Sequence, residues 1–125
     1  MAGKRKSGNR GNNNYEIGRN AEKQVRELIR GEGGKATLSR GSRGAIDVHG
    51  KLGRTRVGIQ VKYSPDRIPP PLSAAATRRL RKEAAAADAV PLIVYGTDDT
   101  GVLCDTGGRI LAVLDLPADY DGSED

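Results

Sequence analysis

The stretch Ala45–Tyr63, AIDVHGKLGRTRVGIQVKY, decides the fold of this chain. It contains two short apolar runs rich in β-branched residues, Ala45–Val48 and Val57–Lys62, on either side of a connection that carries glycine and arginine. Runs of this length and composition are typical of strands, and their separation is typical of a hairpin. We therefore expect two neighbouring strands of one sheet here.

Polar side chains lie inside both predicted strands. Gln60 and Lys62 are two residues apart, so they point to the same face of their strand. If the hairpin forms, Asp47 can lie across from them on that face. Burying an acid, an amide and an amine together is costly unless a metal ion or a substrate uses them. The hairpin therefore predicts a functional site as well as a fold.

Composition and charge limit the classes of protein to consider. The chain has 125 residues and 36% hydrophobic residues with no Phe or Trp, which suits one small α/β core. Residues 1–62 contain 15 Lys and Arg against 5 Asp and Glu, a net charge of +10, whereas residues 63–125 contain 6 against 11, a net charge of −5. A strongly basic half that carries the polar hairpin indicates a polyanionic partner, most simply nucleic acid.

Several classes are disfavoured. Cys104 is the single cysteine, so we expect neither a disulfide framework nor a cysteine-based zinc site. No apolar run approaches a membrane span, and the start of the chain lacks the apolar core of a secretory signal. We expect a cytoplasmic protein that has no membrane association.

The rest of the chain predicts helices and strands in an α/β order. Residues 1–14 are expected to form a flexible basic tail, residues 15–117 the folded domain and residues 118–125 an acidic flexible tail. Within the domain, hydrophobic periodicity and turn residues predict a helix from Tyr15 to about Gly31, a strand at Lys35–Ser39, the hairpin, a proline-rich loop, a helix at Ser73–Ala87, a buried strand at Val90–Tyr95, a turn at Gly96–Gly101, and two short strands at Val102–Asp105 and Arg109–Leu114.

Glu22 lies beside the apolar stripe of the first predicted helix. Taken alone, it is an ordinary flanking charge that could pair with Arg26 four residues later.

Basic residues outside the hairpin are candidates for contacts with DNA phosphates, although each group also has a plain structural interpretation. The loop of residues 39–44 could present amides, hydroxyls and guanidinium groups to a phosphate, or could be a simple turn. The basic cluster of the second helix could face DNA or only solvent, and the N-terminal tail could be an arm on phosphates or only solvated. The candidates are Arg19, Arg40, Ser42, Arg43, Arg78, Arg79, Arg81, Lys82, Lys4, Arg5 and Lys6.

The spacing of Asp47, Gln60-Val61-Lys62 and a preceding helical Glu22 resembles the PD-(D/E)xK nuclease superfamily. Within it, the chain most resembles the archaeal-type Holliday junction resolvases, in the helix with Glu22, the Arg40-Gly41-Ser42 loop, the two hairpin strands and the later buried strand. The resemblance covers most of residues 15–114. It implies an α/β restriction-endonuclease-like fold with a central mixed β-sheet flanked by α-helices.

The resemblance also implies a catalytic site. Glu22, Asp47, Gln60 and Lys62 would be the catalytic residues. Mg²⁺, with Mn²⁺ as a substitute, would be held by oxygens of Asp47, Gln60, Glu22 and the backbone carbonyl of Val61. No organic cofactor is implied. Gln60 departs from the usual pattern, in which this position is glutamate, and the loss of one negative charge should weaken metal binding.

The activity implied is metal-dependent cleavage of four-way (Holliday) DNA junctions by paired, symmetrical nicks from a homodimer. A dimer with two-fold symmetry suits a junction of matching symmetry. Two alternatives stay open: another nuclease of the superfamily that acts on flaps, mismatches or duplex DNA, and a catalytically silent DNA-binding module.

Overall fold

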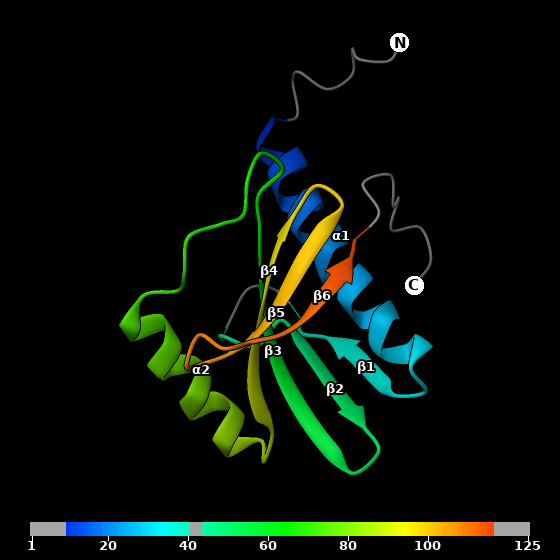
Figure 1. The fold of residues 1–125 in the computed structure, drawn as a ribbon, viewed down its shortest axis with the longest axis vertical. Coiled ribbons are helices and arrows are strands. Elements are labelled where there is room, and N and C mark those ends of the chain that lie inside the picture. Colours follow the sequence, from blue (N-terminus) through cyan, green and yellow to red (C-terminus); the bar gives the residue numbers. More distant parts are fainter. Residues whose placement is uncertain (1–9, 41–43, 117–125) are drawn as a thin grey trace.

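The computed structural model describes residues 10–40 and 44–116 of the chain, with side chains in the first helix from Glu16 onward (Figure 1). Two helices and six strands follow one another as α1 Arg10–Gly31, β1 Lys35–Leu38, β2 Val48–Leu52, β3 Thr55–Tyr63, α2 Ala74–Ala86, β4 Val90–Thr97, β5 Thr100–Asp105 and β6 Ile110–Asp115.

The six strands form one mixed sheet, in which spatial order follows chain order from β1 to β6. All neighbouring strands are antiparallel except β3 and β4, which run parallel with Ile59 opposite Leu92. Parallel neighbours need a crossover connection, and the proline-rich loop with α2 supplies it. The expected α/β fold with a central mixed sheet flanked by helices is confirmed.

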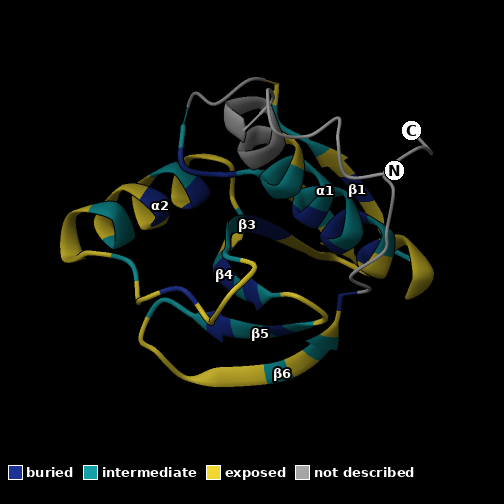
Figure 2. Ribbon diagram, turned by 90° about the horizontal axis from the view of Figure 1, so that it is seen from above, coloured by how far each residue is buried: buried dark blue, intermediate teal, exposed yellow. Residues whose placement is uncertain are grey.

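The two helices cover opposite faces of the sheet, and each face has its own apolar core (Figure 2). On the α1 face, Val25 and Ile29 pack on residues of β1 to β4, including Ile59. On the α2 face, Leu80 and Ala84 pack on Ile93 of β4 and on the segment that precedes β2. Successive residues of β4 are therefore buried on both sides, as its unbroken apolar sequence predicts.

Helix α1 is longer than its apolar stripe predicts. It begins at Arg10 instead of Tyr15, so residues 10–14, expected in the tail, have helical backbone. It ends at Gly31, and the Gly34 N–H then donates to the carbonyl of Ile29. Lys4, Arg5 and Lys6 lie outside the described residues. Within the described ranges, neither helix is both long and apolar enough to cross a membrane.

The hairpin forms, but its first strand is displaced from the predicted position. We expected Ala45–Val48 as a strand, whereas β2 starts at Val48 and continues to Leu52, through residues expected in the connection. Gly50 pairs with Val57 inside β2, and a β-carbon there would stand 2.8 Å from Cδ1 of Ile29. The glycine interpreted as a turn residue is instead a strand residue over which α1 packs closely.

The turn between β4 and β5 is likewise shorter than Gly96–Gly101. β4 reaches Thr97 and β5 begins at Thr100, which leaves Asp98 and Asp99 as the turn residues. Gly96 and Gly101 pair with each other in the ladder. Leu116 fills the space above both backbones, so a side chain at either position would collide with it. Both aspartates lie within the turn that the sequence predicts.

The packing of α2 gives a stability prediction. The Leu80 side chain is fully buried between α2 and the sheet, so Leu80→Ala should lower the free energy of unfolding by about 2–5 kcal/mol. Urea denaturation monitored by circular dichroism measures this change. Arg78→Ala, on the exposed side of the same helix, is the control and should change stability by no more than about 0.5 kcal/mol.

Candidate active site

The candidate site lies where the ladder between β2 and β3 ends. The last Cα pair is Val48 with Ile59. The Asp47 N–H then donates to the Ile59 carbonyl at 2.8 Å, and Oδ2 of Asp47 accepts the N–H of Val61 at 2.8 Å. The aspartate side chain thus takes the place of a strand partner.

This geometry corrects the expected position of Asp47. It precedes β2 instead of lying within a strand, and its carboxylate contacts the backbone of Val61. The backbone bends here because Ala45 and Ile46 must turn into the α2 core while Val48 enters the α1 core.

Glu22 reaches the same place from α1. Its Oε1 accepts a hydrogen bond from Nη1 of Arg19 at 3.0 Å, and the same Nη1 donates to the Ser39 carbonyl at 3.2 Å. The pKa of Glu22 is raised, first because the carboxyl is buried and second because the negative charge of Asp47 is near. Helix and hairpin therefore bring together the two acids that lie 25 residues apart in sequence.

The described pairing of Glu22 is with Arg19, three residues before it, and Nε of Arg26 donates to Glu27. Arg19, expected to contact DNA, thus holds a site carboxylate in this structure. The spacing of Arg19 and Glu22 was the sequence signal for this pair.

Asp47 also has a raised pKa, and its main cause is again desolvation by burial. The Val61 N–H and the charges of Arg19 and Lys62 act in the opposite direction. Two neighbouring carboxyl groups that both resist ionisation form a site that a bound cation would stabilise.

Gln60 and Lys62 lie on the next part of β3, past the end of β2. Val61 packs against the α1 core, so its neighbours on the strand point to the opposite face. Oε1 of Gln60 is buried and has no hydrogen-bond partner among the described residues. A buried amide oxygen is rarely left in this condition without a ligand to satisfy it.

The donor atoms present suit a hard cation. No group of three or more His, Cys, Asp or Glu side chains gathers in the part of the chain that the structure describes. The available donors are the carboxylates of Glu22 and Asp47, the amide oxygen of Gln60 and the backbone carbonyl of Val61. The backbone N–H of Val61 already donates to Asp47. Oxygen-only donors are the ligands that Mg²⁺ prefers, so these residues fit the expected ion.

A second set of contacts fixes the segment that carries Asp47. The Ser39 N–H donates to the Asp47 carbonyl at 2.9 Å, and the Ser39 hydroxyl donates to the Ile46 carbonyl. Nε2 of His49 lies 2.9 Å from the same hydroxyl. Arg40, which follows Ser39 in the chain, is exposed. Ser42 and Arg43, also expected to contact DNA, lie outside the described residues.

Glu83 of α2 holds Ala45, two residues before Asp47, a role that the sequence did not indicate. Its Oε1 accepts the N–H of the buried Ala45 at 2.6 Å, and its Oε2 pairs with Arg79 at 3.1 Å. The bond to Ala45 lowers the pKa of Glu83. The partners are 38 residues apart, so no local pattern could indicate the contact.

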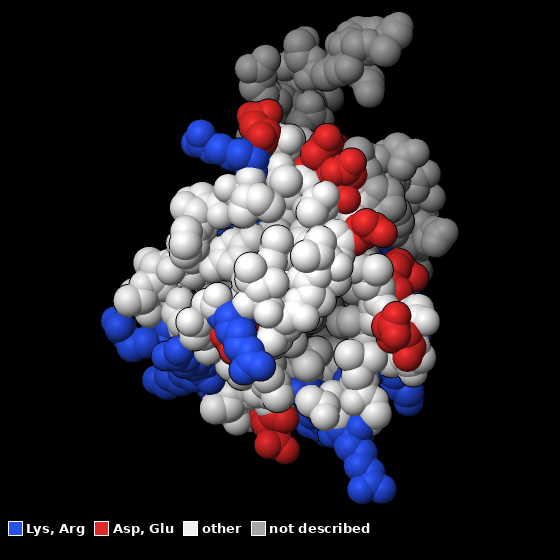
Figure 3. Space-filling model, viewed as in Figure 1, with Lys and Arg blue, Asp and Glu red and all other residues white. Residues whose placement is uncertain are grey.

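The basic cluster of α2 divides into two parts. Arg79 pairs with Glu83, and Arg81 donates to the hydroxyl and the carbonyl of Thr106 at 2.9 and 3.2 Å. Arg78 and Lys82 are exposed. Figure 3 shows the basic side chains gathered over α2 on one side of the molecule.

Comparison with known proteins identifies the fold. No protein-family model matches the chain, and no curated protein sequence matches it. The structure is similar to the solved structure of Hjc from Archaeoglobus fulgidus, a Holliday junction resolvase from an archaeal hyperthermophile. The TM-score is 0.63 at 19% sequence identity, over 78% of this chain and 88% of that chain. The chain therefore has the α/β restriction-endonuclease-like fold of that resolvase.

The anchor on α2 gives a testable expectation. Glu83→Ala leaves the buried N–H of Ala45 without an acceptor and should cost about 1–3 kcal/mol of stability, whereas Glu83→Gln keeps an acceptor oxygen and should cost less. Since the pKa of Glu83 is lowered on folding, the advantage of Glu over Gln is present at neutral pH and fades as pH falls through that pKa. Denaturation of the three proteins at pH 7 and near pH 3 measures both effects. An equal loss for Ala and Gln at pH 7 would contradict this role.

Proposed function

We propose that this protein is a metal-dependent endonuclease that recognises branched DNA and resolves four-way junctions by paired nicks. The observation that carries the proposal is the pair of neighbouring half-buried carboxyls, Glu22 and Asp47, with the Asp47 carboxylate bonded to the N–H of Val61. The residue before Val61 on β3 is Gln60, whose buried amide oxygen has no hydrogen-bond partner among the described residues. This arrangement lies on a fold shared with a Holliday junction resolvase.

Asp47, Gln60 and Glu22, with the carbonyl of Val61, would hold a Mg²⁺ ion, and Mn²⁺ could replace it. The ion, when bound, would lower the pKa of an attacking water and neutralise charge on the scissile phosphate. The chain prepares this site in advance: the Val61 N–H fixes the Asp47 carboxylate, and Arg19 fixes that of Glu22.

Lys62 would act on the reacting groups directly. It lies two residues after Gln60 on the same face of β3, and its charge is close enough to lower the pKa of Asp47. A lysine here can orient the attacking water and stabilise the negative charge that develops on the phosphate during hydrolysis.

Basic groups on both sides of the site would bind the DNA backbone. Arg40 extends from the segment that holds Asp47, and the exposed Arg78 and Lys82 form an outer surface on α2. Arg79 and Arg81 would join them with guanidinium groups held by Glu83 and Thr106. Ser42, Arg43 and the N-terminal Lys4, Arg5 and Lys6 remain predicted contacts. Such contacts position the enzyme by charge and shape and read little sequence.

A homodimer would place two such sites on one junction. An apolar surface for pairing is available on the edge strand β6, where Ile110, Leu111 and Val113 are 64%, 46% and 71% exposed. Figure 3 shows a largely uncharged area over this strand. An exposed apolar edge strand is a surface that proteins normally cover.

The proposed function predicts a specific cleavage pattern. The purified protein with Mg²⁺ should nick a labelled mobile four-way junction symmetrically in two opposing strands and leave linear duplex of the same sequence intact. Lys62→Ala should lower the rate by about 10²–10⁴-fold, as expected for a general acid–base group. Asp47→Ala should lower the cleavage rate by more than ~100-fold. Loss of a group that only supports a metal ligand costs ~10–100-fold, and Asp47 is proposed to bind the metal directly. Sequencing gels that map the cuts in all four strands provide the measurement.

Two outcomes would contradict the proposal in different ways. Equal cutting of junction and duplex would indicate a nuclease of another specificity. Binding of the junction without cleavage by the parent protein, unchanged in Asp47→Ala and Lys62→Ala, would indicate a DNA-binding module without catalysis.

Gln60 allows a test of the metal site that does not depend on activity. Gln60→Glu adds a third carboxylate, so it should tighten Mg²⁺ binding by about tenfold or more (~1.4 kcal/mol) and destabilise the metal-free protein. Calorimetric titration with Mg²⁺, and melting temperatures with and without it, measure both changes. Gln60→Ala is the control, because it removes the oxygen and should weaken binding. An unchanged affinity in both variants would exclude Gln60 as a ligand.

A further inference from the structure

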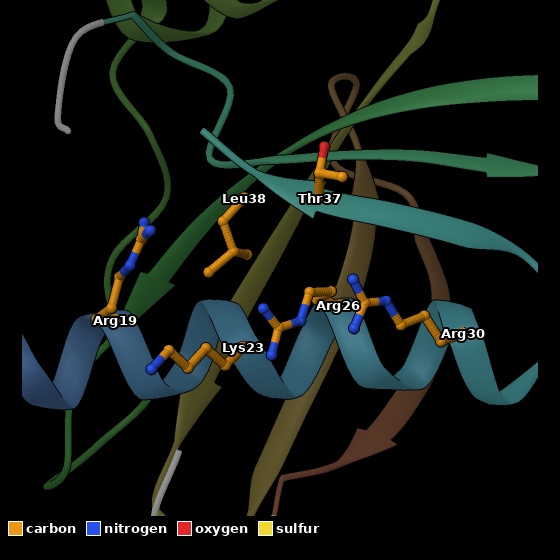
Figure 4. Close-up of a pocket in the computed structure, with 6 residues that line it drawn as sticks. All are labelled: Arg19, Lys23, Arg26, Arg30, Thr37 and Leu38. Carbon is orange, nitrogen blue, oxygen red and sulfur yellow. The ribbon is translucent and has the colours of Figure 1, made fainter. Parts of the chain in front are cut away.

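A row of cations lines one flank of α1 beside the edge strand β1. Arg19, Lys23, Arg26 and Arg30 follow one another at helical spacing and, with Thr37 and Leu38, line a cleft of about 470 Å³. Figure 4 shows the four basic side chains in a row along the helix, next to β1. The described lining contains no acidic side chain.

The three arginines of this row are held in place by hydrogen bonds within the protein. Arg26 is only 6% exposed, and its Nε donates to Oε2 of Glu27 at 2.9 Å. Arg30 donates to the same Oε2 at 3.0 Å and to the Ala36 carbonyl of β1 at 3.0 Å. Arg19 donates to the Ser39 carbonyl just beyond β1. Arginines ordered in this way lose less entropy on binding an anion than mobile surface lysines do.

The cleft is long and begins at the candidate site. From Arg19 to Arg30 the helix rises about 16 Å, at 1.5 Å per residue. Phosphates along one strand of B-DNA are ~3.4 Å apart on the helix axis, so this length corresponds to several successive phosphates. Arg19 at one end is the residue that holds Glu22.

We propose that this cleft binds the phosphodiester backbone of the DNA strand that leads away from the cleaved bond. Guanidinium groups match phosphate oxygens in pairs, and a cleft that carries four cations along its length suits an extended polyanion better than a single small anion. Thr37 and Leu38 of β1 form the opposite wall of the cleft. The inference rests on the proposed nuclease function and adds a substrate-binding surface that the polar hairpin does not include.

The test measures the binding of the full chain to a fluorescent four-way junction in EDTA, where no cleavage occurs. Each phosphate contact contributes ~0.9 to the slope of log K against log salt. The variant Lys23→Gln/Arg30→Gln should therefore reduce the slope by about two. When salt rises from 50 to 200 mM, the factor by which affinity falls should therefore be roughly tenfold smaller for this variant than for the parent protein.

A charge-matched control comes from elsewhere on the surface. Arg54→Gln/Arg109→Gln also removes two positive charges, from exposed turns outside the cleft, and should leave the slope unchanged. If the Arg30 substitution prevents folding, Lys23→Glu keeps the arginine bonds to β1 and should still lower the slope by at least one. Equal slopes for cleft and control variants would overturn the proposal.

A small anion is the competing ligand for this cleft. If inorganic phosphate binds the parent protein and not the cleft variant, while the junction slope stays the same, the cleft is a phosphate site and the proposal fails. If the parent protein binds and cuts junctions but the cleft variant has the same salt slope as the parent, this inference alone is refuted. A parent that binds no DNA refutes the proposed function and this inference with it.

Discussion

The carboxylate of Asp47 accepting the N–H of Val61 is the interaction on which the rest of the site depends. It ends the ladder between β2 and β3 and lets β3 continue without a strand partner on that side. Beyond this point β3 carries Gln60, Val61 and Lys62, which have no Cα partners on β2. A normal strand pair continuing past Asp47 would have used the backbone groups of Val61 in the ladder between β2 and β3.

The electrostatics of the site reflect a balance between folding and chemistry. Burial raises the pKa values of Glu22 and Asp47, and the charge of Asp47 raises the pKa of Glu22 further. The charge of Arg19 offsets part of both increases. The amide oxygen of Gln60, on the adjoining part of β3, is buried and has no hydrogen-bond partner among the described residues. Such groups weaken a fold unless a ligand compensates them, which is why clusters of this kind indicate function. The amide at position 60 keeps this arrangement less charged than a third carboxylate would.

The positioning contacts come from parts of the chain that are distant in sequence. Ala45 is held by Glu83 of α2, and the carbonyl of Asp47 by Ser39 at the end of β1. Helix α1 carries an acid to the site and presents a row of cations along β1. One helix thereby links the proposed chemistry to a surface for the substrate. These roles depend on how α1 and α2 pack on opposite faces of the sheet.

The sequence by itself determined the α/β class, the helices, the buried strand β4 and the polar groups of the hairpin, because each follows from local periodicity or from residue types that are costly to bury. It indicated Asp47, Gln60 and Lys62 as one group through their spacing in the predicted hairpin, although Asp47 lies just before β2. Tertiary structure alone placed Gly50 inside β2, since the local sequence indicates a turn there and the strand role depends on the packing of Ile29 over its backbone. It also decided the contact of Glu83 with Ala45 and the cleft beside β1, because these join segments that only folding brings together.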